Sequence, residues 1–376
     1  MLRHRDPPRW GDRRRPALLV RGLHLDAPLM IGIGLLCLIS LVVVYSASGQ
    51  DGGLIAQQLL RLLMAFMLMA LIAQIPPHHL EFWAPWFYGL SLGLLFAVML
   101  FGDEGKGAQR WLDIGGFRFQ PSEMMKLALP MMVAWYFADH QLPPNKRGIA
   151  ITLLLIAVPA ALIARQPDLG TAMLIVAGGL SVLLLAGLRI RHIMFFVMTG
   201  AALAPLVWFN LHDYQKSRIL NFLDPERDPL GTGYHIIQSK IAIGSGGLYG
   251  KGWMNGSQAQ LDFLPEQSTD FIFAVLSEEF GLIGVLLLLA IYLFVISRGL
   301  YIATQAQDTF ARLLAGGLIL SFFVYMCINI GMVTGLLPVV GVPLPLISYG
   351  GTSMVTLMSA FGVLMSIQTH RRLVST

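Results

Sequence analysis

Charged side chains are scarce in this chain, and some of them occur where they could do chemistry. Pro121 and Ser122 favour the start of a helix, which places Glu123 and Lys126 on one face of its first turn. Arg110 precedes this segment, next to Trp111, and with Lys126 it could neutralise a diphosphate while Glu123 holds the lysine in place. A dipole-compensating glutamate and a snorkelling lysine are the alternative without a function.

A second pair of opposite charges lies in the turn from Arg165 to Thr171. Arg165 and Asp168 flank a proline in this turn, and both are expected at the same membrane level as Glu123 and Lys126. Asp168 could equally be an ordinary helix N-cap. Ionisable groups near membrane depth are functional candidates by default, so both are kept as candidate substrate-binding residues.

Asp270 opens an apolar run and is expected at the water–membrane boundary, at or near a helix N-terminus. Such a position lowers the pKa of a carboxyl, whereas burial raises it, and the sequence does not decide between them. Glu278 and Glu279 follow either within one continuous helix or near the end of a short helix that stops at Gly281. We favour the short helix, because residues 270–300 are too long for one untilted span.

The elements that position these residues are membrane helices. Hydrophobic residues make up 56% of the 376 residues and charged residues only 12%, against about 25% in soluble domains. Long apolar runs without period-two alternation indicate helices rather than a barrel. We therefore expect an all-α polytopic integral membrane protein with about ten transmembrane helices. They are expected near 27–46, 54–74, 81–101, 122–138, 149–164, 171–187, 193–210, 281–300, 312–336 and 347–368.

Charge placement predicts the orientation. Residues 1–26 form a basic tail that is expected in the cytoplasm, and an even number of spans puts the C-terminus there as well. Cleavage as a signal peptide and nucleic-acid binding are less favoured interpretations of this tail. Residues 27–376 then form a single domain, in which residues 211–280, between the seventh and eighth spans, make a large ordered extracytoplasmic cap.

A glycine-rich stretch, Gly244–Gly252, invites comparison with a phosphate loop but fails the Walker pattern at two positions, so we expect no nucleotide. Another interpretation stays open, in which backbone amides beside Lys251 form a nest that binds a lipid diphosphate. The nine histidines include no pair at metal-ligand spacing, and no serine lies in a Gly-x-Ser-x-Gly elbow, so a zinc site or serine hydrolase is not supported.

Several long motifs in order resemble the SEDS family, named for shape, elongation, division and sporulation, and are closer to its elongation branch than to its division branch. They are Gly107–Asp113, Phe119–Lys126, Gln166–Thr171, Asp224–Lys251, Phe263–Gly284 and Asn329–Ser353. Together they extend over nearly the whole chain.

This resemblance implies a peptidoglycan glycosyltransferase that polymerises lipid II at the outer face of the bacterial inner membrane, with a class B penicillin-binding protein as partner. It implies that Asp270 is the essential acid and that Trp111, Glu123 and Lys126 are important. Lys251 and Ser348 join the substrate-binding candidates because they lie in resembling segments. Ser268 departs from the histidine found in many members, which puts a role for a histidine there in doubt.

The residues themselves fit such chemistry. Asp270 could take the proton from an acceptor hydroxyl, and Arg110 and Lys126 could stabilise the departing diphosphate. Direct displacement with inversion is expected. A divalent cation (Mg²⁺ or Mn²⁺) held by Asp270 is an alternative source of charge. A flippase, for which Arg61 and Glu278–Glu279 are the available intramembrane charges, and a non-catalytic scaffold are the other functional alternatives.

Overall fold

The computed structural model describes residues 24–105, 108–114, 117–210, 213–228, 231–261, 263–264 and 266–370. Most of the predicted basic tail therefore lies outside the described residues.

The chain is almost entirely helical. Its elements are α2 (Ala27–Ala47), α3 (Gly52–Ala73), α4 (Pro77–Phe101), β1 (Asp103–Gly105), β2 (Ala108–Ile114), β3 (Phe117–Phe119), α5 (Pro121–Ala138), α6 (Lys146–Arg165), α7 (Leu169–Leu185), α8 (Ile190–Asn210), α9 (Asp213–Leu223), η1 (Pro225–Arg227), α10 (Thr232–Gly246), α11 (Ser257–Gln260), α12 (Ile272–Gln305), α13 (Thr309–Val333) and α14 (Thr352–Thr369).

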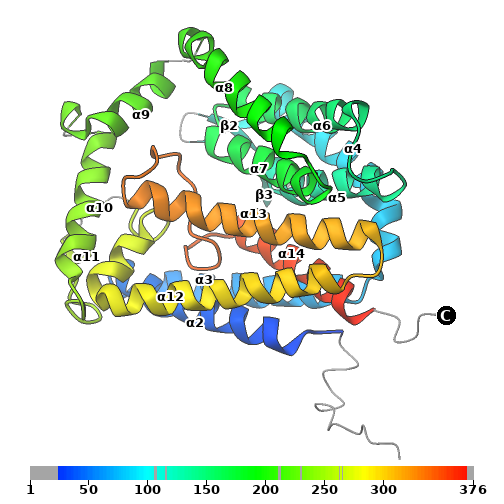
Figure 1. The fold of residues 1–376 in the computed structure, drawn as a ribbon. Helices are drawn as coiled ribbons and strands as arrows, with labels where there is room; N and C mark the ends of the chain where they lie inside the picture. Colours follow the sequence, from blue (N-terminus) through cyan, green and yellow to red (C-terminus); the bar gives the residue numbers. More distant parts are fainter. Residues whose placement is uncertain are drawn as a thin grey trace, which may run out of the picture.

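A helix occupies each range predicted to span the membrane, and among the described residues seven helices are long and apolar enough to do so. These seven are α2, α3, α4, α6, α12, α13 and α14. A multi-pass membrane protein is therefore confirmed, while the count of ten spans stays a prediction. The long helices α12 and α13 run side by side through the bundle (Figure 1).

The two ends of the bundle differ. At one end the first and last described residues meet: His24 stacks on His370 with 4.3 Å between ring centroids, and Thr369 Oγ1 donates to the His24 carbonyl. At the opposite end lie α10 and α11 (Figure 1). We call the first the termini end and the second, with the helices α9–α11, the cap end. His24 and His370 thus lie on one side of the bundle, away from the cap.

Local signals explain where the helices begin. Asp26, Asp51, Asn145 and Asp168 each accept a hydrogen bond from the first turn of the helix that follows. The α5 helix begins at Pro121, as its sequence predicts. These caps fix the positions of side chains in the first turns, where several candidate site residues lie.

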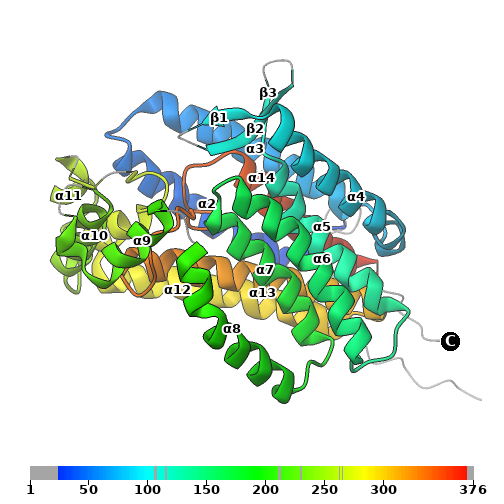
Figure 2. The ribbon, with the colours of Figure 1, turned by 90° about the horizontal axis from the view of Figure 1, so that it is seen from above.

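The expectation of an all-α fold needs one correction. The connection before α5 forms a three-stranded antiparallel sheet in the order β1-β2-β3, with Leu112 opposite Phe119 and Ile114 opposite Phe117. Gly115-Gly116 between β2 and β3 is a hairpin signal that sequence reasoning passed over. The sheet packs through β2 against α4 and α5 (Figure 2) and carries Arg110 and Trp111 on β2.

The predicted break at Gly281 is confirmed. Gly281 interrupts α12 with φ 62° and ψ −161°, a conformation that favours glycine, and a Cβ there would lie 2.3 Å from the backbone nitrogen of Gly250. Residues 272–280 are therefore a short helix packed against the cap, and the long apolar part of α12 follows it.

Candidate functional site

Asp270 lies directly before Phe271, the N-cap of α12, in a segment whose backbone accepts hydrogen bonds at three successive carbonyls. We call this segment, residues 268–270, the strap. The Ser268 carbonyl accepts from the Tyr349 amide (2.8 Å), that of Thr269 from Ser348 Oγ (2.5 Å), and that of Asp270 from Asn329 Nδ2 (2.9 Å). The backbone that carries the carboxylate is thus fixed by α13 and by the loop after it, while the Asp270 side chain itself stays half-buried.

The loop of residues 338–351 lies against the Asp270 carboxylate. Gly341 has φ 73°, and a Cβ there would lie 3.4 Å from Asp270 Oδ2. Asn329, fully buried on α13, donates to the Val342 carbonyl (2.7 Å) as well as to Asp270. One amide side chain therefore joins the loop to the strap.

Arg110 reaches from β2 to the turn before α7. Its Nη2 donates to the Pro167 carbonyl (2.7 Å), and its Nη1 lies 3.7 Å from Asp168 Oδ2. Asp168 also accepts from the amide and the hydroxyl of Thr171, which confirms it as an N-cap. The ion-pair partner of Asp168 is therefore Arg110. Arg165 ends α6 as an exposed residue.

The turn before α7 contacts the loop of residues 338–351, which also contacts Asp270. A Cβ on Gly170 would lie 2.7 Å from the Val340 carbonyl oxygen and 2.9 Å from the Val342 side chain. The Arg110–Asp168 pair and Asp270 thus flank one loop at the cap end, although 102 residues of sequence separate the two aspartates.

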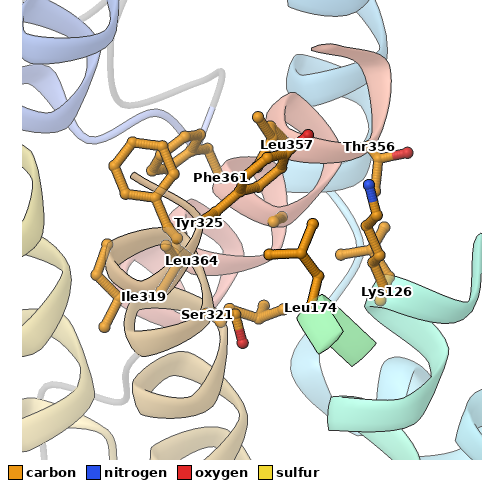
Figure 3. Close-up of a pocket in the computed structure, with 13 residues that line it drawn as sticks. Lys126, Leu174, Ile319, Ser321, Tyr325, Thr356, Leu357, Phe361 and Leu364 are labelled. Carbon is orange, nitrogen blue, oxygen red and sulfur yellow. The ribbon is translucent and has the colours of Figure 1, made fainter. Parts of the chain in front are cut away.

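The pair formed by Glu123 and Lys126 is confirmed. Lys126 Nζ lies 2.7 Å from Glu123 Oε1, with side chains 14% and 8% exposed, so little water screens the pair. Lys126 also lies over the ring of Tyr325 at 5.1 Å. Figure 3 shows Lys126 on one side of a small cavity and Tyr325 and Phe361 on the other. Among the described residues, Glu123 Oε2 is buried without a hydrogen-bond partner.

Trp111 lines a larger cavity of about 630 Å³, together with Glu123 and Arg61. Sequence reasoning therefore located several residues that the fold brings together. Ser348 lies in the loop after α13, where its hydroxyl is used on the backbone: it accepts from the Leu344 amide and donates to the Thr269 carbonyl.

Lys251 lies elsewhere, in a cluster around Glu278. Its Nζ is 2.6 Å from Glu278 Oε1 and 2.7 Å from Ser257 Oγ. The amides of Lys251 and Gly252 donate to the carbonyls of Glu278 and Glu279, so they are committed to the end of the short helix. Gly246 and Gly250 let the backbones approach, because a Cβ on either would lie about 2 Å from a carbonyl oxygen of that helix. The glycine-rich stretch thus packs against the short helix, and a phosphate nest beside Lys251 stays a prediction.

His235 on α10 borders the strap from the cap side. Its ring stacks on Phe271, with 5.8 Å between centroids. Burial lowers the pKa of His235, against the weaker opposing effect of Glu266 and Asp228, so its imidazole is held in the neutral form.

Sequence reasoning missed Asn329 and Tyr325 as parts of this site. Both are polar side chains in an apolar helix, and that contrast was the available signal. Their partners, Asp270 and Lys126, come from distant segments that only the fold brings near.

The geometry suits acid–base chemistry on an anionic substrate. The backbone that carries the half-buried Asp270 carboxylate is fixed at the start of α12. Arg110 pairs with Asp168 in the turn that contacts the same loop as Asp270, and Lys126 contacts Tyr325 on α13, the helix that carries Asn329. A general base and stabilisation of a departing anion are what transfer from a diphosphate requires.

Comparison with known proteins identifies the family. Residues 24–373 match the family model of the FtsW, RodA and SpoVE cell cycle proteins. The chain belongs to the FtsW/RodA/SpoVE family. A family relative, the peptidoglycan glycosyltransferase MrdB of Escherichia coli K12, is 54% identical over 354 residues, which cover 94% of this chain and 96% of MrdB. MrdB of Helicobacter pylori strain 26695 is 37% identical, with 93% and 91% covered.

Solved structures of the family have the same fold. A chain of a peptidoglycan synthase complex, solved to show how polymerization and crosslinking are coordinated, matches with a TM-score of 0.82 and 32% identity over 93% of this chain and 99% of that one. The rod shape determining protein RodA of Thermus thermophilus matches with a TM-score of 0.70 and 27% identity over 92% and 96%.

Proposed function

We propose that this chain is a peptidoglycan glycosyltransferase that joins lipid II units into glycan strands at the outer face of the inner membrane during cell elongation. The observation that carries the proposal is the position of Asp270: its strap is fixed by Asn329, Ser348 and Tyr349 at the cap end, beside the loop that also contacts the Arg110–Asp168 turn. The relatives named peptidoglycan glycosyltransferases support the same activity.

In the proposed reaction Asp270 takes the proton of the acceptor sugar hydroxyl. The hydroxyl oxygen then bonds to the anomeric carbon of the donor as the bond from that carbon to the lipid diphosphate breaks, with inversion. Lys126 and Arg110 stabilise the negative charge on the departing diphosphate. Glu123 and Asp168 hold these two cations in place.

A divalent cation such as Mg²⁺ or Mn²⁺ is an alternative source of positive charge. Within the described ranges no group of three or more His, Cys, Asp or Glu side chains could hold one. Mg²⁺ is often bound by one carboxylate together with substrate phosphates and water, and Asp270 fits that limited role.

The cap end is proposed to face outwards and both termini to face the cytoplasm, in keeping with the predicted charge bias. The partner is proposed to be a class B penicillin-binding protein, which cross-links the strands. The similar chain in a synthase complex that coordinates polymerization and crosslinking supports such a partner.

A flippase is the second candidate, because Arg61 lies within α3 and lines a cavity that extends along the bundle. Purified chain, reconstituted with its partner in vesicles and supplied with labelled lipid II, separates the alternatives. Glycan polymer is the result we expect. Translocation without polymer would indicate a flippase, and neither product would indicate a scaffold.

A further inference from the structure

Two polar side chains on α13 lie one helical turn apart, and both contact residues of the site. Tyr325 and Asn329 are four residues apart, which places them on the same face of the helix with about 6 Å between them along its axis. Both are buried, with 4% and 0% of their surface exposed. Polar side chains are uncommon inside an apolar membrane helix, so the contacts of this pair need an explanation beyond packing.

Asn329 holds the segment that carries Asp270. Its Nδ2 donates to the carbonyls of Asp270 (2.9 Å) and Val342 (2.7 Å). Both acceptors are carbonyl oxygens, so the amide nitrogen has to face them, and Oδ1 stays buried without a hydrogen-bond partner among the described residues. An unpaired buried oxygen costs stability. The presence of an amide here is therefore better explained by the two carbonyls that it holds than by packing of the core.

Tyr325 contacts the cation Lys126. Lys126 Nζ lies 5.1 Å from the centroid of the Tyr325 ring, and Figure 3 shows the two on facing sides of one small cavity. The hydroxyl of Tyr325 lies 2.9 Å from Ser353 Oγ, in the first turn of α14. The ring is thus held at both ends, by α13 and by α14. It gives the ammonium group a fixed aromatic face in addition to the ion pair with Glu123.

A shared loop residue connects the two contacts. Tyr325 belongs to a small buried cluster whose other members come from α7, from α13 and from the loop of residues 338–351: Leu174, Ile328 and Val342. Val342 is also the residue whose carbonyl accepts from Asn329. Displacing Tyr325 therefore disturbs the loop residue that Asn329 holds.

Glycosyl transfer by direct displacement requires a fixed separation between the base and the cation. The acceptor oxygen enters on one side of the anomeric carbon and the diphosphate leaves from the other, so the base and the cation have to lie on opposite sides of one carbon atom. Reacting atoms approach to about 3–3.5 Å, and a misplacement of about 1 Å can cost about 10²-fold in rate. One helix that contacts both the strap and Lys126 can set such a separation.

We propose that Tyr325 and Asn329 are positioning residues that act as one unit, through which α13 holds the Asp270 strap and Lys126 at the separation that the displacement requires. Their role rests on the proposed function. Each acts through the residue that it contacts, and removing either one is enough to lose the alignment.

The test measures kcat and KM for polymerisation of labelled lipid II by the full chain in its partner complex. Tyr325→Leu removes the ring from Lys126, Tyr325→Phe keeps the ring, and Asn329→Leu removes both donated hydrogen bonds. Tyr88→Leu and Gln58→Leu are the matched controls. Tyr88 is a buried tyrosine whose hydroxyl donates to a backbone carbonyl of α6, and Gln58 is a fully buried amide on α3. Unfolding in detergent is measured for every variant.

Tyr325→Leu and Asn329→Leu should each lower kcat about 10- to 100-fold and leave KM within about threefold of wild type, because substrate still binds while base and cation are misaligned. Tyr325→Phe should retain most of the activity. The double variant should lie within about threefold of the slower single variant, since residues that act as a unit are not additive. The two controls should lose stability without a change in kcat.

Losses that multiply in the double variant would overturn the proposal, because two independently damaged packing sites give additive free energies. A Tyr325→Phe variant as slow as Tyr325→Leu would also contradict it, since the ring would then not be the contact that matters. If Asn329→Leu does not fold, Asn329→Ser, which keeps one donor, replaces it in the same cycle with an expected loss of about 2- to 10-fold in kcat.

Polymer formation by the wild type separates this role from the proposed function. If the wild-type complex polymerises lipid II and the single variants keep its kcat, only the positioning role fails. If the wild-type complex forms no glycan, the proposed function fails and the positioning role fails with it.

Discussion

Asp270 and Glu278 are eight residues apart on either side of the start of α12, and their surroundings contrast. Glu278 is fully buried and accepts hydrogen bonds from Lys251, Ser257 and the Gln258 amide. Asp270 is half-buried, and Asn329 donates a hydrogen bond to its backbone carbonyl. The first arrangement joins the cap to the bundle, and the second fixes the segment that carries the Asp270 carboxylate beside the loop of residues 338–351.

The contrast shows that charge near a membrane surface is a poor guide to function until its partners are known. Lys251 and Lys126 were both substrate-binding candidates in the sequence, yet Lys251 pairs with a fully buried carboxylate in the cap and Lys126 lies in the first turns of α5, beside the site. The following predictions test this division through stability, from the largest expected change to the smallest.

Removing Lys251 should have the largest effect on stability. Lys251→Met leaves the carboxylate of Glu278 buried without its cation, and the free energy of unfolding should fall by about 1–3 kcal/mol, the desolvation cost of a buried polar group that loses a partner. Unfolding in detergent measures the change, with exposed Lys146→Met as the control. The remaining folded protein should still polymerise. A stable variant that has lost polymerisation would instead place Lys251 in the substrate site.

A double variant sharpens the same point. Glu278→Gln in the Lys251→Met background removes the unpaired buried charge and should restore about 1–3 kcal/mol of unfolding free energy. No recovery would mean that the ion pair is not the source of the loss.

Asp168→Ala should cost about 1–2 kcal/mol of unfolding free energy through the lost N-cap of α7. It should also lower polymerisation, because Arg110 loses its ionic partner beside the loop that contacts Asp270. Asp51→Ala is the matched control, since Asp51 caps α3 through the Gly53 and Leu54 amides. Its stability loss should be similar while polymer yield is unchanged. If the two variants gave equal polymer yields, the turn before α7 would have no role in the site.

The smallest effect concerns pH. Because the folded pKa of His235 lies below its usual value of 6.5, folding disfavours the protonated ring. The stabilisation is therefore present above about pH 6.5 and is lost as pH falls towards the folded pKa. The protection factors for hydrogen exchange in α10, which correct for the intrinsic dependence of exchange on pH, should be lower at pH 5.5 than at pH 7.5, and His235→Gln should remove most of the difference. If His235→Gln left the pH dependence of protection in α10 unchanged, titratable groups other than His235 would be its cause.

The sequence predicted the helices well because each apolar run has the length that a bilayer requires and polar caps mark where several begin. It also placed the Glu123–Lys126 pair and the break at Gly281, which depend on local geometry. It missed the small sheet, whose Gly-Gly hairpin signal is brief, and it paired Asp168 with its neighbour Arg165 rather than Arg110, which is 58 residues away. Long-range pairs of this kind depend on how the helices pack, which local spacing does not specify.

The central claim is that the Asp270 carboxylate takes the acceptor proton, and Asp270→Asn tests it most directly. The change keeps size and hydrogen bonding but removes basicity, so polymer yield should fall about 10²–10⁴-fold, the usual contribution of a general base. Yield is measured with labelled lipid II on variants matched for monodispersity and for partner complex, with Asp51→Asn as the control. Folding and partner binding should persist in both. Polymerisation by Asp270→Asn at nearly the wild-type rate would contradict the account, because neither a base nor a metal ligand would then be required at this position.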